Sequence, residues 1–237
     1  MGDPGLLGFS KKANGGSLTV YKRFLKRVFD IVISLLLLPF FALLLIIFAP
    51  IIFLTDRGPV FYASERIGRN GKLFKMIKFR SMYVDAPDIR LADGSTFNGE
   101  DDPRVTKIGK FLRASSLDEI PQVLNVLAGQ MSLIGPRPDP PDCLDRYPED
   151  VRVFLNVRPG ITGYNQAYFR NSSDGTEKMK NDVYYATHCT FGLDLRITFK
   201  TLAVVFVHEN VYRNIENEKE AIRQAELYSM TKKDSDN

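Results

Sequence analysis

The chain has 237 residues, a formal net charge of +4 and a sequence pI near 9.0. This length allows one domain of moderate size with an anchor, and the basic excess suits a surface that faces anionic lipids or phosphorylated substrates. The two cysteines, Cys143 and Cys189, lie far apart and exclude a disulfide framework, and no Cys/His spacing matches a zinc site. We therefore expect a reducing, cytoplasmic setting.

Residues 1–19 are rich in glycine and small polar side chains, and we expect them to form a mobile tail. Residues 20–56 then read as a membrane element with a basic lead-in. From Ile31 to Leu54 the chain runs 24 residues without a charge and with one polar side chain, Ser34. A straight helix of that length, at ~1.5 Å per residue, would cross a ~30 Å hydrocarbon core.

Two features favour a re-entrant hairpin over a helix that crosses the bilayer. Lys and Arg residues flank the apolar run on both sides, and such residues favour the cytoplasmic side. Pro39 and Pro50 lie inside the run, and each removes a backbone donor. A break at Pro39 leaves arms of ~12 and ~22 Å, which are too short to span. The alternative is a tilted, kinked helix that spans once.

Two strands are predicted after the anchor, at Pro59–Ser64 and Lys72–Met82. Asn70-Gly71 lies between them and predicts a hairpin turn, because Asn-Gly tolerates positive φ. Lys78 and Arg80 are two residues apart in the second strand and are predicted to share a face, although they could simply decorate a solvated surface. Residues 84–104 are predicted to form a long polar loop that could cover a site.

The spacing of apolar residues predicts a short basic amphipathic helix over 105–113, lying at the membrane interface or against the core. The next helix is predicted to open at residues 117–122 and to run to about Ala128. Pro121 is expected in its first turn, which places Asp118 near the N-cap. Ser116 followed by Glu119 matches a capping box, and capping alone could explain the acidic pair.

Two later segments carry an arginine beside backbone-restricting residues. The stiff Gly135–Pro138 segment holds Arg137 between two prolines, which suits a guanidinium that binds phosphate or carboxylate. Arg158 stands next to a tight glycine turn of similar character, and a plain surface turn is the alternative for both. Residues 194–211 are predicted to form an apolar helix or strand, and residues 216–233 a polar tail helix.

Several of these segments, in this order, resemble one family: the bacterial sugar transferases, or monotopic phosphoglycosyl transferases. The resemblance covers about residues 21–212. The segments that carry it are Lys26–Asp30, Gly58–Phe61, Lys78–Met82, Leu117–Gln122, Ser132–Pro138 and Arg158–Gly163. Each is weak alone, but the ordered set behind a single anchor is specific.

The resemblance implies an enzyme that moves a sugar-1-phosphate from a UDP-sugar to polyprenol (undecaprenyl) phosphate and so starts the assembly of a surface glycan. It implies a helix-dominated α/β fold, with a re-entrant membrane hairpin, interfacial amphipathic helices and a small β-hairpin or sheet. The catalytic domain, residues 57–212, is expected on the cytoplasmic face of the bacterial inner membrane, followed by a polar tail, residues 213–237. The Ser-Pro pair at which the family breaks its hairpin falls here on Ala42-Leu43, so Pro39 or Pro50 must supply the bend.

The family's adjacent Asp-Glu pair matches Asp118-Glu119. The resemblance implies Asp118 as the nucleophile on the donor's β-phosphorus and Glu119 as a positioning group or base. Because both substrates are anionic, we expect Mg²⁺, with Asp118 or Glu119 as its ligand. The candidate substrate-binding cations are Lys78, Arg80, Arg113, Arg137 and Arg158.

Two rival functions remain at this point. A catalytically silent membrane scaffold for a glycan-assembly complex is opposed by the intact acidic pair and the motif cations. A membrane-tethered nucleic-acid binder is opposed by the scattering of its cations through separate motifs, without interleaved aromatic residues. Membrane lipid and a second copy of the chain are the remaining partners that these features allow.

Overall fold

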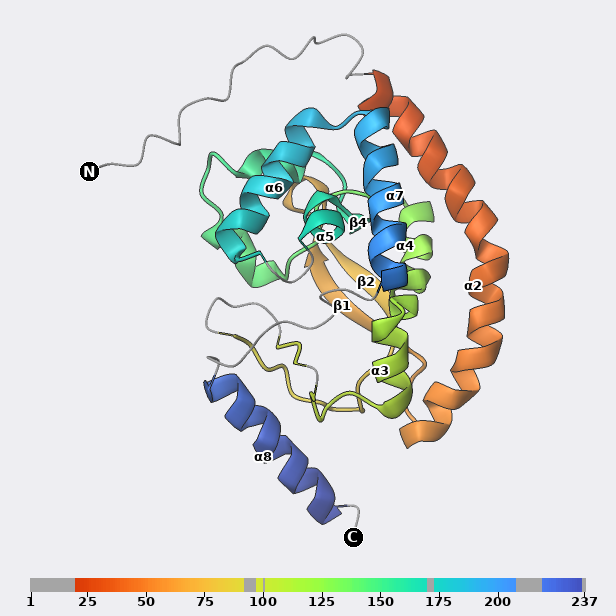
Figure 1. Ribbon diagram of the computed structural model, residues 1–237, viewed down its shortest axis with the longest axis vertical. Helices are drawn as coiled ribbons and strands as arrows, with labels where there is room; N and C mark the ends of the chain where they lie inside the picture. The colour runs from red at the N-terminus through yellow and green to blue at the C-terminus, as the bar shows by residue number, and fades with distance from the viewer. Residues whose placement is uncertain (1–19, 92–96, 100, 170–172, 208–218, 236–237) are drawn as a thin grey trace, which may run out of the picture.

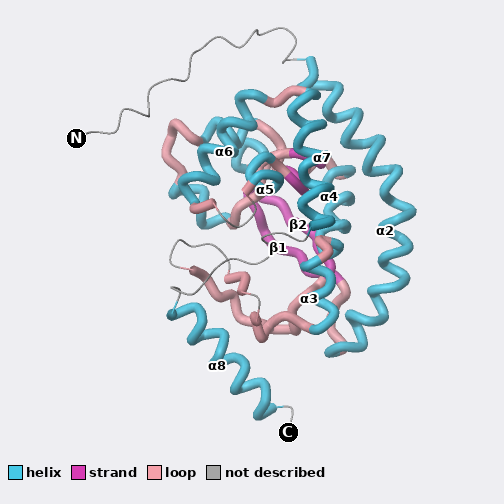
Figure 2. Tube along the Cα trace, in the orientation of Figure 1, coloured by secondary structure: helices cyan, strands magenta, loops and turns pink. Residues whose placement is uncertain are grey.

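The computed structural model describes residues 20–91, 97–99, 101–169, 173–207 and 219–235 (Figure 1). Within these residues helices dominate, and the strands form two separate two-stranded sheets (Figure 2). The predicted helix-dominated fold with a small β-hairpin is therefore confirmed. The predicted tail at residues 1–19 lies outside the described residues.

One long helix, α2 (Lys26–Asp56), continues a π-helical turn at Tyr21–Leu25 and bows along one side of the molecule (Figure 1). Its buried residues recur on one face and are Asp30, Ser34, Phe41, Leu44, Phe48 and Ile52. On the opposite face Leu36, Ile46 and Leu54 are each about 75% exposed. By length and composition α2 could cross a membrane, and its outer apolar face is left uncovered by the described part of the protein.

Pro39 and Pro50 lie inside α2 and do not interrupt it. The structure therefore shows one curved helix where the sequence led us to expect two arms, and the hairpin is not confirmed. Each proline removes only one backbone hydrogen bond, and the remaining bonds keep the helix continuous because free polar groups are costly in apolar surroundings. The loss of one backbone hydrogen bond at each proline is compatible with the gentle curvature of α2.

Both ends of α2 are attached to the same folded domain. Near its start, Lys26 Nζ lies 2.7 Å from Asp194 Oδ2. At its end, Asp56 Oδ2 lies 2.6 Å from Arg80 Nη1. Between them the buried stripe of α2 packs on the domain core, where Phe48 contacts the β-hairpin and α3. The helix thus lies lengthwise against the domain.

Strands β1 (Phe61–Ile67) and β2 (Leu73–Phe79) pair antiparallel and form the predicted hairpin. The turn η2 (Arg69–Gly71) places Asn70 at φ 59° and Gly71 at φ 74°, the left-handed region that the Asn-Gly sequence predicted. A second, parallel pair joins β3 (Ser132–Ile134) to β4 (Gly160–Thr162).

The remaining elements surround the two sheets. In chain order they are α3 (Lys107–Ala114), η3 (Leu117–Gln122), α4 (Val123–Leu127), η4 (Pro141–Arg146), η5 (Arg152–Asn156), α5 (Tyr164–Tyr168), α6 (Gly175–His188), α7 (Phe191–Val207) and α8 (Lys219–Ser235). Helix α3 confirms the predicted amphipathic helix. The single helix predicted over 117–128 is instead a 3-10 helix followed by a short α-helix, and the apolar segment after residue 190 is helical.

The long polar loop at residues 84–104 is organised around Arg104. This side chain is 1% exposed and forms a buried ion pair with Asp102, Nη2 to Oδ2 at 2.7 Å. Two carbonyls of the loop, at positions 87 and 97, accept its other donors. The tail helix α8 packs on this loop through Ala221 and Ala225. A loop that looked featureless in sequence therefore has a buried core.

Candidate functional site

The acidic pair lies where η3 packs against β2, and Glu119 is held there by two cations. Lys78 Nζ of β2 donates to Glu119 Oε1 at 2.7 Å. Arg137, from the segment after β3, donates through both terminal nitrogens to the two carboxylate oxygens of Glu119, at 2.6 and 3.2 Å. Burial raises the pKa of Glu119, but Arg137 and Lys78 outweigh burial and hold the pKa well below its usual range. Glu119 is therefore fixed and ionised.

Asp118 has the opposite environment. It is 7% exposed, and its carboxylate makes no hydrogen bond or ion pair with any described residue. Burial, with repulsion from Glu119 as a further cause, raises its pKa to about 6, against the opposing charges of Lys78, Arg113 and Arg137. The carboxylate of Glu119 is thus held by two cations, whereas that of Asp118 makes no bond although cations surround it.

The predicted capping box between Ser116 and Glu119 is wrong. Ser116 precedes η3 at φ 57°, and its side chain makes no cap hydrogen bond. The Glu119 carboxylate bonds two distant cations instead, because charge-assisted bonds are about twice as strong as neutral ones. Pro121 lies inside η3, just before α4. The acidic pair therefore does more than stabilise a helix start.

Arg137 is placed by a backbone contact that only glycine allows. The amide of Gly135 donates to the carbonyl of Thr162 at 2.8 Å, and the amide of Gly160 donates to the carbonyl of Pro136 at 2.9 Å. A Cβ on Gly135 would overlap backbone atoms of Gly160 and its neighbours. The two chains thus lie backbone to backbone, and the flanking prolines then fix the direction of Arg137.

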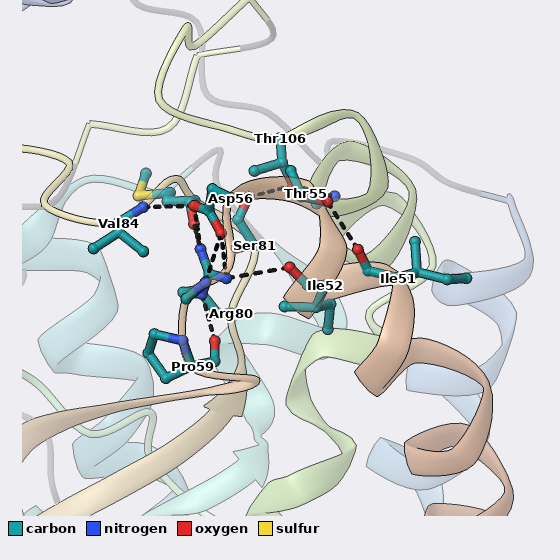
Figure 3. A network of polar contacts seen from close by, with 12 residues as sticks. Ile51, Ile52, Thr55, Asp56, Pro59, Arg80, Ser81, Val84 and Thr106 are labelled. Carbon is teal, nitrogen blue, oxygen red and sulfur yellow. Dashed lines mark hydrogen bonds and ion pairs between the residues drawn. The ribbon is translucent and has the colours of Figure 1, made fainter.

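Arg80, predicted to share a face and a role with Lys78, has a different partner. Strand β2 ends at Phe79, and the guanidinium of Arg80 turns to the end of α2 (Figure 3). It lies 2.6 and 2.7 Å from the two oxygens of Asp56, and it also donates to the carbonyls of Ile52, Pro59 and Met82. Because these bonds occupy the side chain, the geometry does not support Arg80 as a substrate-binding residue.

Ser81 links this contact to the acidic pair. Its hydroxyl accepts from Arg113 Nε at 2.9 Å. Its carbonyl accepts from the amide of Thr106 at 3.0 Å, and Figure 3 shows the two residues side by side. A Cβ on Gly109 would overlap the Ser81 carbonyl, so α3 lies directly on this residue. Arg113, whose charge acts on Asp118, is oriented by these contacts.

Sequence reasoning missed Asp56 and Ser81 as site-positioning residues. The available signal for Asp56 was its place as the acid that ends the apolar run.

Arg158 is not brought to the acidic pair. Its Nε donates to the carbonyl of Gly129 at 2.9 Å, just after α4. Arg27 of α2 donates at the same place, to the carbonyl of Val126 at 2.6 Å. Two cations thus bind carbonyls at and just beyond a helix C-terminus, where positive charge is favourable. Of the five candidate cations, the structure gathers Lys78, Arg113 and Arg137 around Asp118-Glu119.

Comparison with known proteins identifies the family of the chain. The family described as bacterial sugar transferase matches residues 21–208. The undecaprenyl-phosphate galactose phosphotransferase of Salmonella typhimurium is 41% identical over 201 residues, which are 80% of this chain and 42% of that protein. A UDP-glucose:undecaprenyl-phosphate glucose-1-phosphate transferase of Klebsiella pneumoniae is 38% identical and covers 79% of this chain and 41% of its own length.

The exopolysaccharide production protein ExoY of Sinorhizobium fredii is 36% identical over 198 residues, which are 79% of this chain and 88% of that protein. The chain therefore spans less than half of the Salmonella and Klebsiella relatives but most of the length of ExoY. Since the family match runs through nearly all of the described residues, this chain belongs to the bacterial sugar transferase family.

Proposed function

We propose that the chain transfers a sugar-1-phosphate from a UDP-sugar to undecaprenyl phosphate through a covalent intermediate on Asp118, and so starts the assembly of a surface glycan. The observation that carries the proposal is the contrast within the acidic pair. Glu119 is held by Lys78 and Arg137, whereas Asp118 is nearly buried and unbonded beside them. The names of the Salmonella and Klebsiella relatives, which specify undecaprenyl phosphate, support the choice of acceptor.

The first step forms a bond between an Asp118 carboxylate oxygen and the β-phosphorus of the donor. The bond from that phosphorus to the bridging oxygen breaks, and UMP leaves with the electron pair. In the second step a phosphate oxygen of the lipid acceptor attacks the same phosphorus, and the carboxylate of Asp118 is released. Lys78 and Arg137 offset the charge of the phosphates, while their bonds to Glu119 keep both cations in place.

The carboxylates of the pair fit a role for Mg²⁺. Within the described residues no group of three or more His, Cys, Asp or Glu side chains could hold a metal ion. Mg²⁺ nevertheless commonly binds one or two carboxylates together with substrate phosphates. The unbonded carboxylate of Asp118 suits this better than Glu119, which already bonds two cations. A bound ion would neutralise phosphate charge, so we expect a chelator to stop UMP release and added Mg²⁺ to restore it.

We also propose that α2 dips into one leaflet and returns, with both ends and the catalytic domain on the cytoplasmic side. The support is that the two ends of α2 contact one domain, through the Lys26–Asp194 and Asp56–Arg80 ion pairs. In a helix that crossed the bilayer, these ends would lie on opposite sides of the membrane. The uncovered apolar face of α2 supplies the surface that lipid would contact.

The direct test is UMP release by the Asp118→Asn variant. We expect release to fall to background, because an amide cannot form the phosphorus–oxygen bond. Asp145→Asn, at an exposed position, is the matched control and should behave like the wild type. Sustained UMP release by Asp118→Asn would rule out Asp118 as the nucleophile.

A further inference from the structure

Arg66 is a cation near the site that the mechanism above does not use. It lies on β1 and is half-buried. Its guanidinium makes no hydrogen bond or ion pair with any residue that the structure describes, unlike Arg137 and Arg80, which bond carboxylates directly. A partly buried cation without a counter-charge is unfavourable unless an anion or water compensates it. Arg66 is therefore placed for a partner that the protein itself does not supply.

The register of the hairpin places Arg66 on the catalytic face of the sheet. Residues directly opposite in an antiparallel pair share a face, and the pairs here include Tyr62 with Lys78, Ser64 with Met76 and Arg66 with Phe74. Lys78 extends from that face to Glu119 at 2.7 Å. Arg66 therefore follows Lys78 along one side of the hairpin, in the direction of the turn.

Ser64 lies between them on the same face and provides a second, independent observation. Its hydroxyl is buried and has no hydrogen-bond partner. Buried hydroxyls nearly always have a partner, so an unpartnered one marks a place where a ligand or water can complete the bonding. An unpartnered hydroxyl beside an unpaired guanidinium is the combination that would bind an oxyanion.

The charges around Arg66 also favour an anion. Arg137 and Lys78 both bond the carboxylate of Glu119, and the charges of Asp118 and Asp139 also act on Arg137. Burial lowers the pKa of Arg66, and repulsion from Arg137 and Arg90 lowers it further, whereas the charge of Asp139 opposes this without bonding the guanidinium. Arg137 is thus the cation whose charge Arg66 feels most strongly. An anion bound between Arg66 and Arg137 would offset the cost of burying the Arg66 charge. It would also reduce the repulsion between the two guanidinium groups.

We propose that Arg66, together with the hydroxyl of Ser64, forms a second phosphate subsite beside the catalytic pair, for a phosphate other than the one that Asp118 attacks. Arg66 lies four residues along β1 from Tyr62, which is opposite Lys78, a separation of ~13 Å. The long side chains of Arg66 and Lys78 must therefore extend toward each other to reach neighbouring phosphates. The assignment rests on the proposed function for the source of this phosphate. The nucleoside phosphate of the donor and the phosphate of the lipid acceptor share the required chemistry.

The first arm of the test measures binding without turnover, using thermal unfolding of the full chain in detergent with UMP or inorganic pyrophosphate as the probe. Arg66→Gln should bind UMP about 10- to 100-fold more weakly than the wild type, because one charged hydrogen-bonding partner is lost. Arg66→Lys should bind UMP with intermediate affinity, since lysine keeps the positive charge but lacks the paired donors of the guanidinium group. Arg69→Gln, an exposed position in the hairpin turn, is the matched control and should bind like the wild type.

The melting temperature of the unliganded protein distinguishes a binding role of Arg66 from a structural one. Removing an unpaired, half-buried charge should leave the melting temperature of Arg66→Gln equal to or above that of the wild type. A structural arginine would lower it. A drop of several degrees in unliganded Arg66→Gln, with the ligand-induced shift unchanged, would overturn the subsite.

The second arm separates the two sources by steady-state kinetics. A raised KM for the UDP-sugar, with weaker UMP binding, assigns the subsite to the donor. A raised KM for a short-chain polyprenyl phosphate, with normal UMP binding, assigns it to the acceptor. If Arg66→Gln matches Arg69→Gln in binding and in both KM values, the subsite is refuted. If Arg66→Gln loses phosphate binding while Asp118→Asn still releases UMP, the subsite stands and the proposed nucleophile fails.

Discussion

Two adjacent carboxylates in this chain are driven to opposite properties by side chains from distant parts of the sequence. Glu119 bonds Lys78 and Arg137 and has a lowered pKa. Asp118, one residue earlier, bonds no described group and has a pKa raised to about 6. Pairs of titratable groups whose pKa values are pushed apart are a common mark of catalytic sites. The cause here is partner geometry, because both groups belong to the same 3-10 helix, yet Glu119 bonds two cations and the buried Asp118 bonds none.

The raised pKa of Asp118 predicts that Asp118→Asn is more stable than the wild type at neutral pH. The folded-state pKa of about 6 exceeds the ordinary aspartate pKa of 3.8, so ionisation of this carboxyl opposes folding. A difference of about two pKa units corresponds to about 3 kcal/mol of unfolding free energy. This advantage of the variant should be complete above pH 6 and should vanish as the pH falls below about 4.

The measurement is the melting temperature of both proteins across this pH range, in chelator so that no metal occupies the carboxylate. Asp145→Asn is again the matched control, and its melting curve should follow the wild type. A less stable Asp118→Asn at pH 8, or a gap that does not change with pH, would contradict the account.

The sequence predicted which side chains gather at the acidic pair better than it predicted what each of them contacts. Asp118, Glu119, Lys78, Arg113 and Arg137 were all proposed from motifs, and the structure brings them together. The alternation of side chains along a strand predicts that Lys78 and Arg80 share a face. It could not show that they bond different partners, because that depends on where β2 ends and on Asp56 of another element. The capping-box prediction failed because a local pattern cannot reveal distant cations that compete for Glu119.

Among the elements, the contact between α2 and β2 connects the long apolar helix to the acidic pair. Arg80 joins the last turn of α2 to the end of β2 (Figure 3). Lys78 lies two residues before it in the chain, and Ser81, which follows it, bonds Arg113. The position of α2 is thus transmitted over a few bonds to cations that face Asp118. Arg80 is a positioning residue in this account.

Removing this contact should reduce both stability and activity. Arg80→Gln leaves Asp56 largely buried without its partner, and breaking such a pair by removing one member costs about 3–5 kcal/mol. We expect a lower melting temperature and slower UMP release. The double variant Arg80→Gln, Asp56→Asn should recover part of the stability, because no unpaired charge remains.

Arg57→Gln, one residue beyond α2 and exposed, is the control for this experiment. Equal melting temperatures for Arg80→Gln and Arg57→Gln would show that the ion pair does not attach α2 to the domain.

The boundaries of helices and strands were predictable where the local sequence alone determines the backbone conformation. The hairpin turn was predictable because Asn70 and Gly71 both adopt positive φ, which few other sequences tolerate. The β3–β4 pair was not, because its strands are three residues long and are joined by backbone contacts of Gly135 with Gly160. The strand propensity of single residues says little about so short a pair of strands. The close approach of the two backbones at the glycines determines this pairing.

Considered as a whole, the molecule is a domain with a long apolar helix along one side (Figure 2). Asp30, near the start of α2, accepts a hydrogen bond from the hydroxyl of Ser132 at 3.0 Å, although the two residues are 102 positions apart. Contacts of this kind fix α2 to the domain and could not be read from sequence. The continuity of α2 through Pro39 and Pro50 likewise depends on the whole length of the helix and its surroundings.

This arrangement predicts that both ends of α2 face the cytoplasm. Single cysteines at Val20 and Val84, which are 59% and 39% exposed, should both react with a membrane-impermeant reagent from the cytoplasmic side only. The background would lack Cys143 and Cys189. Reaction of the two positions from opposite sides would establish a helix that spans the bilayer and would exclude the re-entrant arrangement.

The central claim is the covalent bond between Asp118 and the sugar phosphate, and mass spectrometry after incubation with a UDP-sugar alone tests it most directly. The account predicts that, without lipid acceptor, the wild-type chain gains the mass of one sugar phosphate on the peptide that contains Asp118, and that polyprenyl phosphate then removes it. Transfer of the sugar phosphate to the lipid without any such adduct, or an adduct on another residue, would contradict it.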